Sequence, residues 1–245
     1  MQQFFKLTIE YDGTGYHGWQ IQPNGPTIQE TVEAALERIT ARQIRIHSSG
    51  RTDAGVHALG QCAHFGCETH LTPEIFQKAL NAVLPTDIVI KNCENVDADF
   101  HARFSAKSKR YQYRIWNDPT PMAIGRQYTL HISKPLDLGK MRAAAEYLLG
   151  EHDFRGFETV GTPHLTTIRC VYDVLFTKFN AEIHFDIEAN GFLRYMVRSI
   201  VGTLLEVGLD KRAVNSVEEI LASGDRKLAG VTAPAHGLTL LCVRY

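Results

Sequence analysis

Ser49-Gly50-Arg51-Thr52-Asp53-Ala54-Gly55-Val56-His57-Ala58 is the stretch from which the rest of the chain can be interpreted. It places a carboxylate, a guanidinium, a hydroxyl and an imidazole around two glycines, directly after residues 43–47, whose polar and apolar side chains alternate. Alternation with period two predicts a half-buried strand, so the polar cluster is expected where that strand ends. Gly50 and Gly55 permit backbone angles that other residues avoid, which predicts a tight loop that holds its side chains at fixed angles.

Asp53 is the candidate catalytic residue of this loop. The positive charge of Arg51, two positions away, favours the ionised carboxylate. A fixed, ionised carboxylate suits nucleophilic or general-base chemistry better than general-acid chemistry. The alternative is purely structural, because aspartate in a Gly-rich loop commonly caps a turn, and Arg51 would then pair with it at the surface.

The loop resembles the GRTDxGVHA loop of the tRNA pseudouridine synthase A family, in which the aspartate is the essential catalytic residue. Further segments resemble the same family in the same order: YDGTGYHGWQ at 11–20, KRYQY at 109–113, MVRSIVG at 196–202 and GLTL at 237–240. The resemblance covers nearly the whole chain. It implies an isomerase that converts uridine to pseudouridine in the anticodon arm of tRNA, just 3′ of the anticodon, at about positions 38 to 40.

The resemblance also implies roles for residues outside the loop. Tyr111, the first tyrosine of the KRYQY segment, would lie against the target base, although a core ring like that of Tyr113 is equally consistent with the residues alone. Leu238 of the GLTL segment would pack beside the active site, where an ordinary core position is the alternative. Arg51 is expected to help hold the displaced RNA backbone.

Arg198 lies in the middle of a predicted helix, from about residue 192 to 207, that is apolar nearly all round. A buried arginine without an anion costs several kcal/mol, so it requires a carboxylate partner. In the family that the chain resembles, this arginine pairs with the catalytic aspartate, which is Asp53 here. The alternative is that Arg198 extends to solvent at the edge of the helix.

Basic and aromatic side chains are concentrated between residues 100 and 127. Six Lys and Arg residues occur there against one acid, Asp118, although the formal net charge of the chain is only −1. Cations that contact phosphates, beside rings that stack on bases, are what single-stranded or looped RNA requires. A solvated, positively charged hairpin is the alternative. The candidate RNA-binding residues are Arg103, Lys107, Lys109 and Arg110.

The composition indicates a cytoplasmic protein with free thiols. The chain of 245 residues is 44% hydrophobic, has no apolar run near the roughly 20 residues that span a bilayer, and lacks a signal-peptide pattern at its start. Its five cysteines are odd in number and scattered, which favours a reducing compartment. Neither a membrane span nor secretion is expected.

No cofactor or metal is expected. The glycines that follow the first strand, at positions 13, 15 and 18, form neither a dinucleotide fingerprint nor a phosphate-binding loop with its lysine. Cys62, His64, Cys67 and His70 lie close in sequence, but they contain no CxxC pair and extend past the end of the expected strand. Pseudouridine formation itself requires no electron or group carrier.

The predicted elements indicate an α+β fold. Strands are expected near residues 5–11, 43–47, 60–65, 87–90, 109–116, 172–179, 182–188 and the C-terminus, and helices near 27–39, 72–83, 137–150, 192–207 and 216–221. The resemblance implies two similar lobes, 1–105 and 106–245, which together make one catalytic unit. Their mostly antiparallel strands would form a mixed sheet flanked by helices, with the active-site cleft between the lobes.

Two functions from other classes were weighed against the synthase. A noncatalytic RNA-binding protein would use the basic segment and contain a merely structural Asp53 loop. A glycosidase normally needs two cooperating acids, and no second acid stands near Asp53 in sequence. For a synthase, Asp53 could attack the base, attack the sugar, or stabilise a cation and take a proton. The resemblance further implies a homodimer with tRNA lying across both subunits.

Overall fold

The computed structural model describes residues 2–159 and 166–245, and its backbone contacts divide the chain into two compact units. Unit 1 comprises Met1–Lys107 and Thr239–Tyr245, and unit 2 comprises Ser108–Leu238. The sequence places the boundary after residue 105 and assigns the C-terminal strand to the second lobe. In the structure that strand belongs to unit 1, because its residues Thr239 and Leu240 pair with the strand that follows the Asp53 loop.

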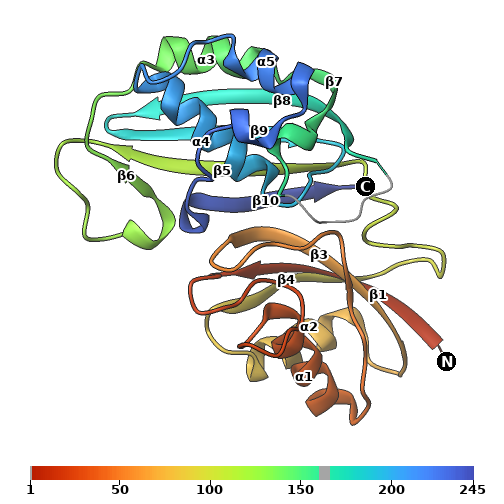
Figure 1. Ribbon diagram of the computed structural model, residues 1–245. Coiled ribbons are helices and arrows are strands. Elements are labelled where there is room, and N and C mark those ends of the chain that lie inside the picture. Colours follow the sequence, from red (N-terminus) through yellow and green to blue (C-terminus); the bar gives the residue numbers. More distant parts are fainter. Residues whose placement is uncertain (1, 160–165) are drawn as a thin grey trace. The chain divides into compact units, whose positions relative to one another are not determined.

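Unit 1 contains a mixed sheet in the order β4-β1-β3-β10, with β2 added to β3 (Figure 1). All of these pairings are antiparallel except that of β3 with β10. Phe5, Leu7 and Ile9 alternate along β1 and are fully buried, as the period-two pattern predicts. The strands are β1 (Gln2–Tyr11), β2 (His47–Ser48), β3 (His57–Glu68), β4 (Ile88–Asn95) and β10 (Leu238–Arg244).

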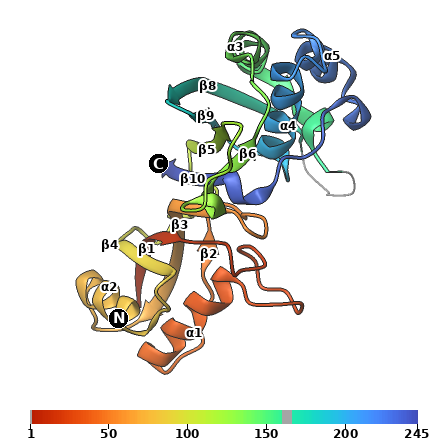
Figure 2. The same cartoon turned by 90° about the vertical axis from the view of Figure 1, so that its left-hand side faces the viewer.

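The helices α1 (Ile28–Thr40) and α2 (Pro73–Val83) cover one face of this sheet (Figures 1 and 2). The capping residue of α1 is the predicted Thr27, whose hydroxyl accepts a hydrogen bond from the backbone of Glu30 at 3.3 Å. Helix α2 starts at a proline. Proline is favourable there, because the first residue of a helix has no intrahelical partner for an N–H group. The ring of Phe76 on α2 packs against those of Phe5 and Phe65.

The strand predicted at residues 43–47 is wrong for most of its length. Only His47–Ser48 forms β2, although Ile44 and Ile46 are buried as the alternation predicts. The reason is that side chains of α1 bond to the backbone groups that would otherwise pair with a neighbouring strand. The carboxylate of Glu33 accepts the backbone N–H of Ile46 at 3.0 Å, and the amide of Gln29 donates to the carbonyl of Ile46 at 3.2 Å.

Unit 2 contains strands in the order β5-β9-β8-β7, all antiparallel, with β6 parallel to β5. The predicted β8–β9 hairpin forms, and Asn180 at its turn has a φ of 55°. Figure 2 shows the helices on one side of these strands. The elements are β5 (Ser108–Asn117), β6 (Leu130–Ile132), α3 (Leu138–Glu146), β7 (Gly150–Asp153), β8 (Ile168–Phe179), β9 (Glu182–Ala189), α4 (Met196–Gly208) and α5 (Ser216–Ser223).

Helix α4 begins four residues later than predicted. Tyr195 has a φ of 61°, in the left-handed region, so the helical backbone starts only at Met196. Arg198 therefore lies half-buried in the first turn, and not buried in the middle of the helix. The predicted end of α3 at Gly150 is also wrong, because the helix stops at Glu146 and Gly150 begins β7.

The α+β prediction is confirmed, with a mixed arrangement of strands and five α-helices among the described residues. None of those helices has the length and apolar character that crossing a membrane would require. All five cysteines carry free thiols.

Candidate active site

The Asp53 loop connects β2 to β3 and is held against the loop that follows β1. Backbone N–H groups of Trp19 and Gly55 bond across this contact, to the carbonyls of Thr52 at 3.1 Å and Tyr16 at 3.3 Å. Within the loop, the N–H of residue 56 donates to the carbonyl of Asp53 at 3.1 Å. These bonds fix the backbone on both sides of Asp53. Its side chain is half-buried.

Two glycines allow the loops to approach this closely. A Cβ added to Gly13 would lie 2.1 Å from the carbonyl oxygen of Val56, which is well inside any allowed contact. A Cβ on Gly18 would lie 2.6 Å from the carbonyl oxygen of Thr52, and Gly18 also has a φ of 88°. These glycines therefore serve backbone packing against the Asp53 loop.

A buried network of hydrogen bonds joins the same loop to side chains of β1 and β3. The hydroxyl of Tyr11 lies 2.8 Å from that of Thr52, and the hydroxyl of Ser49 donates to the side-chain oxygen of Gln61 at 2.7 Å. The amide of Gln61 donates to the carbonyl of Gly50 at 3.0 Å. Burial raises the pKa of Tyr11 to about 12, so it remains a phenol at neutral pH. This network was not predicted from the sequence.

Removing one hydroxyl should test the support that this network gives. Tyr11→Phe takes away the partner of the buried Thr52 hydroxyl, and we expect a loss of about 1–2 kcal/mol in unfolding free energy. We also expect kcat to fall, because Thr52 is the residue directly before Asp53 and a shift of Thr52 would displace the catalytic carboxylate. Tyr16→Phe is the matched control, since its hydroxyl bonds Asp87 at 2.8 Å in the same unit. Equal kcat values for the two variants, measured beside urea denaturation, would contradict a positioning role.

His57, at the start of β3, lies beside the Asp53 loop. The backbone N–H of Gly13 donates to His57 Nδ1 at 3.0 Å, which requires an unprotonated nitrogen there. The carboxylate of Asp12 lies 3.1 Å from the same nitrogen and would pair with its protonated form. The two contacts require opposite protonation states of one nitrogen, and the well-placed N–H donor favours the neutral ring with its proton on Nε2.

Arg51 is exposed at the edge of the loop. Among the residues that the structure describes, no ion pair or side-chain hydrogen bond involves it, so the structural alternative of an Arg51–Asp53 surface pair is not observed. A guanidinium with this exposure can contact a phosphate at little cost.

In unit 2, Tyr111 lies on β5 opposite Ile187 of β9 and is 8% exposed. Its ring meets that of Phe192 edge to face, with centroids 5.1 Å apart. Tyr113, two positions on and therefore on the same face, is fully buried and donates its hydroxyl to the carbonyl of Pro234 at 2.8 Å. Both tyrosines are therefore buried, Tyr113 completely and Tyr111 almost completely.

Arg198 is fixed to the segment that precedes β10. Its Nε donates to the carbonyl of Ala233 at 2.8 Å, and its own carbonyl accepts the N–H of Ala233 at 3.0 Å. Its guanidinium also lies 4.8 Å from the ring centroid of Tyr195. A cation in the first turn of a helix opposes the helix dipole, so a nearby anion is favourable at this position. The same segment leads to Leu238, which is 5% exposed.

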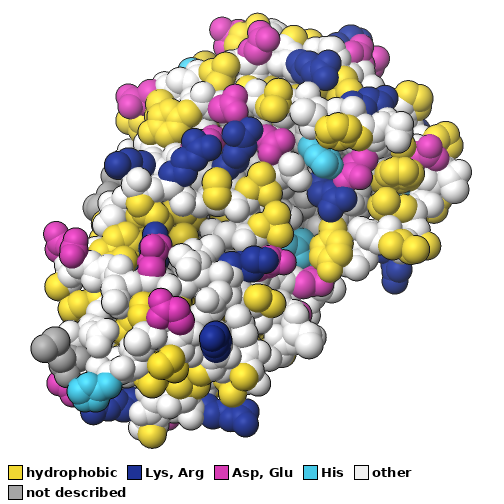
Figure 3. Space-filling view, turned by 180° about the vertical axis from the view of Figure 1, so that it is seen from behind, with side chains coloured by type: hydrophobic (Ala, Val, Ile, Leu, Met, Phe, Trp, Pro, Cys, Tyr) yellow, Lys and Arg dark blue, Asp and Glu magenta, His cyan; other side chains and the backbone are white. Residues whose placement is uncertain are grey.

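The four candidate RNA-binding residues differ in their surroundings. Arg103 and Lys107 are exposed, and Lys109 is half-buried. Arg110 is surrounded by three carboxylates, at 3.2 to 3.7 Å, from strands β8 and β9. A phosphate would have to compete with these acids, so Arg110 is expected to contribute least. Figure 3 shows one face on which basic, acidic and apolar side chains are interspersed.

The candidate site residues thus occupy both units. Asp53 and Arg51 lie in unit 1, and Tyr111, Arg198 and Leu238 lie in unit 2. No group of three or more His, Cys, Asp or Glu side chains in the described residues is arranged to hold a metal ion.

Known proteins resemble the chain over almost its full length. The family model for tRNA pseudouridine synthase matches residues 7–105 and 144–245. The protein named tRNA pseudouridine synthase A from Acetivibrio thermocellus is 48% identical over 98% of both chains. Proteins of the same name from a Thermoanaerobacter species and from Ruminiclostridium cellulolyticum are 48% and 45% identical, again over 98% of both chains.

Proposed function

Because the chain belongs to the tRNA pseudouridine synthase A family, we propose that it converts uridine to pseudouridine in tRNA. The observation that carries this proposal is the carboxylate of Asp53, presented on a loop whose backbone is held on both sides. This is the arrangement that a reaction at a fixed atom requires, since small displacements of a reacting group greatly slow a reaction. The enzyme is accordingly an isomerase.

The reaction balances without a cofactor. The bond between N1 of uracil and C1′ of ribose breaks, the uracil turns over while it stays bound, and C5 forms a new bond to C1′. The proton that C5 carried is released, and N1 takes up a proton. The uridine must first leave its stack, which costs a few kcal/mol and requires cationic and aromatic groups to replace its neighbours.

The described residues supply these groups. Asp53 is the catalytic carboxylate, and Arg198 pairs with it and orients it, which would provide the anion that the first turn of α4 favours. Arg51 contacts the displaced RNA backbone. Tyr111 stacks on the uracil and assists removal of the C5 proton, and Leu238 packs beside the base.

The tRNA is bound through its anticodon arm, and the modified uridine lies just 3′ of the anticodon. Arg103, Lys107 and Lys109 contact the phosphates, with a smaller part for Arg110 because of its three acidic neighbours. The enzyme acts as a homodimer with the tRNA lying across both subunits, and a monomer mass in sedimentation equilibrium would count against this. Its place is the cytoplasm, where free thiols persist.

Release of tritium from tRNA labelled at C5 of uridine tests the function directly, because formation of the carbon–carbon bond expels that hydrogen. We expect the purified protein to release tritium in proportion to pseudouridine formed. Tight binding of tRNA without release would instead identify a noncatalytic RNA-binding protein, and formation of free uracil would identify a hydrolase.

A further inference from the structure

A turn of unit 1 outside the proposed catalytic residues, His101–Ser105, is held firmly in place. The backbones of its first and last residues bond to each other at 2.8 Å. Ala102 within it is fully buried, and its N–H donates to Nδ1 of His64 on β3 at 3.1 Å. The carbonyl of Ala102 accepts the hydroxyl of Tyr245 at 2.9 Å. The turn is therefore a fixed part of the unit.

Phe104 extends from this turn into solvent and is 76% exposed. Single exposed apolar side chains are ordinary on protein surfaces, but the support of this one is not. Its ring packs against that of His101 in a tilted arrangement, with centroids 4.3 Å apart and planes at 36°. The ring of His101 lies 4.6 Å from that of His64. The three rings contact one another in sequence from β3 to the surface, so Phe104 is supported by the ring of His101 while it remains largely open to solvent.

The supporting imidazole is uncharged near neutral pH. Nδ1 of His101 accepts the backbone N–H of Arg103 at 3.1 Å, so that nitrogen carries no proton. Burial and the neighbouring imidazole of His47 lower the pKa of His101. The positive charge at this surface therefore comes from Arg103, whose guanidinium carbon lies 5.6 Å from the ring centroid of Phe104. A ring beside a fixed cation is what an unpaired nucleobase and its phosphate require.

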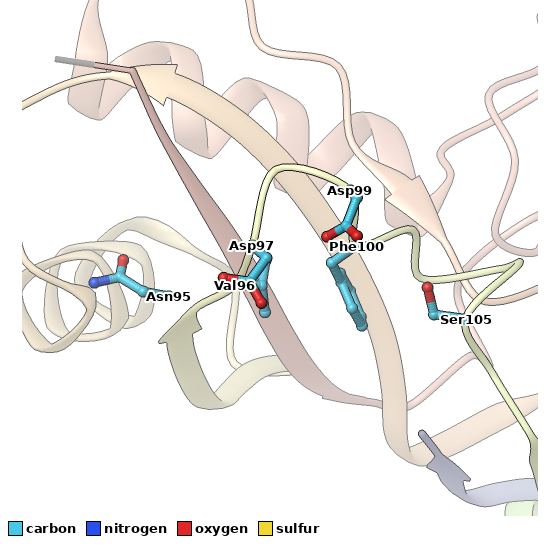
Figure 4. Close-up of a pocket in the computed structure, with 6 residues that line it drawn as sticks. All are labelled: Asn95, Val96, Asp97, Asp99, Phe100 and Ser105. Atoms are coloured by element: carbon cyan, nitrogen blue, oxygen red, sulfur yellow. The ribbon is translucent and has the colours of Figure 1, made fainter.

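Acidic residues limit where the phosphate can lie. Asp97 and Asp99 line an open hollow of ≈ 450 Å³ together with Ser105, the last residue of the turn (Figure 4). Their carboxylates repel phosphate, so the RNA backbone is expected on the side of Arg103 and not in the hollow. Lys107, exposed two residues beyond the turn, supplies a second cation for the same strand.

The start of the Asp53 loop lies near this surface, because the N–H of Ser49 donates to the carbonyl of Cys62, two residues from His64, at 2.8 Å, whereas the end of the loop lies farther along β3. His64, which supports the turn, is the eighth residue of β3, whereas His57 begins β3 at the end of the loop. At about 3.3 Å for each of the seven steps, the two positions are roughly 23 Å apart. Asp53 lies near the His57 end, because its carbonyl accepts the N–H of Val56 at 3.1 Å, so a base at Phe104 would differ from the one at Asp53.

We propose that Phe104, supported by His101 and flanked by Arg103, is a stacking site for an unpaired nucleobase of the tRNA, distinct from the uridine that is modified. This inference rests on the proposed function, and it adds a second position at which the enzyme binds its tRNA substrate.

The test compares Phe104→Ala, Phe104→Leu and Phe104→Trp with wild type in the binding of unmodified tRNA. Loss of one base stack should raise Kd and KM by about 5- to 150-fold in the alanine variant, with kcat unchanged. Leucine keeps apolar volume without a π face and should bind nearly as poorly, whereas tryptophan should restore binding and show fluorescence quenching by tRNA. The salt dependence of Kd should stay the same, since no phosphate contact is lost.

Phe179→Ala is the matched control, because it removes a phenylalanine that is 62% exposed on β8 of unit 2. Equal tRNA binding by Phe104→Ala and wild type would overturn the inference, as would full binding by the leucine variant. A change in oligomeric state in Phe104→Ala would also overturn it, because the ring would then belong to an interface between copies. The binding assay needs no turnover, so a wild-type protein that binds through Phe104 without releasing tritium would refute only the proposed function.

Discussion

Asp53→Asn is expected to abolish turnover while leaving the fold and tRNA binding intact. Asparagine has nearly the same shape, and the backbone bonds that hold the loop are kept. The amide lacks the charge and the basicity that nucleophilic or proton-transfer chemistry requires. We expect kcat/KM for tritium release to fall by at least about 10²–10⁴-fold, the range for losing a single proton-transferring group.

The control for this variant is Glu37→Gln, which removes the charge of an exposed carboxylate on α1 in the same unit. It should release tritium at the wild-type rate. A tRNA-binding measurement and a urea titration on Asp53→Asn separate lost chemistry from lost structure. Retention of activity by Asp53→Asn would show that the reaction is correct and the central residue is not.

Local patterns were sufficient for most of the helices and strands. Helix α1 was predictable because its cap lies at Thr27, directly before its apolar stripe, and the β8–β9 hairpin because its turn tolerates the left-handed backbone of Asn180. The start of α5, expected near residue 216, differs in detail, because Asn215 occupies the cap and Ser216 donates its hydroxyl to the carbonyl of Ala213.

The other errors arose where distant residues decide the local structure. Residues 43–46 alternate like a strand, but their backbone bonds go to side chains of a helix that precedes them. Tyr195 adopts a left-handed backbone that no pattern of apolar residues indicates. Its effect is to place Arg198 in the first turn of α4, where its charge opposes the helix dipole.

The candidate site shows the same division between local and distant information. Asp53 was identifiable because its loop is a contiguous motif, whereas the bond between Tyr11 and Thr52 joins residues 41 positions apart. A sign of that network was nevertheless present, since Gln61 lies within a strand of small and apolar residues and has no place there without a partner. From the sequence alone, Arg110 was predicted to be available for RNA, but the register of the strands places three acids around it.

Gly18→Ala should strongly reduce stability and should also impair catalysis. The added Cβ would meet the carbonyl oxygen of Thr52 at 2.6 Å, and its φ of 88° is unfavourable for alanine. The two penalties together predict a loss of about 2–4 kcal/mol in unfolding free energy. Because the atoms displaced include the backbone of Asp53, kcat should fall by up to about 10²-fold in the variant that still folds.

Two other glycines separate the two causes. Gly125 has a φ of 82° with no atom within 4 Å of an added Cβ, so Gly125→Ala should lose only about 1–2 kcal/mol and keep its kcat. Gly15, three residues before Gly18, has neither a positive φ nor a neighbour within 4 Å, and Gly15→Ala should leave both quantities nearly unchanged. If Gly18→Ala behaved like Gly125→Ala, with a lower urea midpoint but full kcat, the contact with Thr52 would not position Asp53. A loss of kcat in Gly18→Ala alone would show that close packing of two backbones holds the catalytic carboxylate in place.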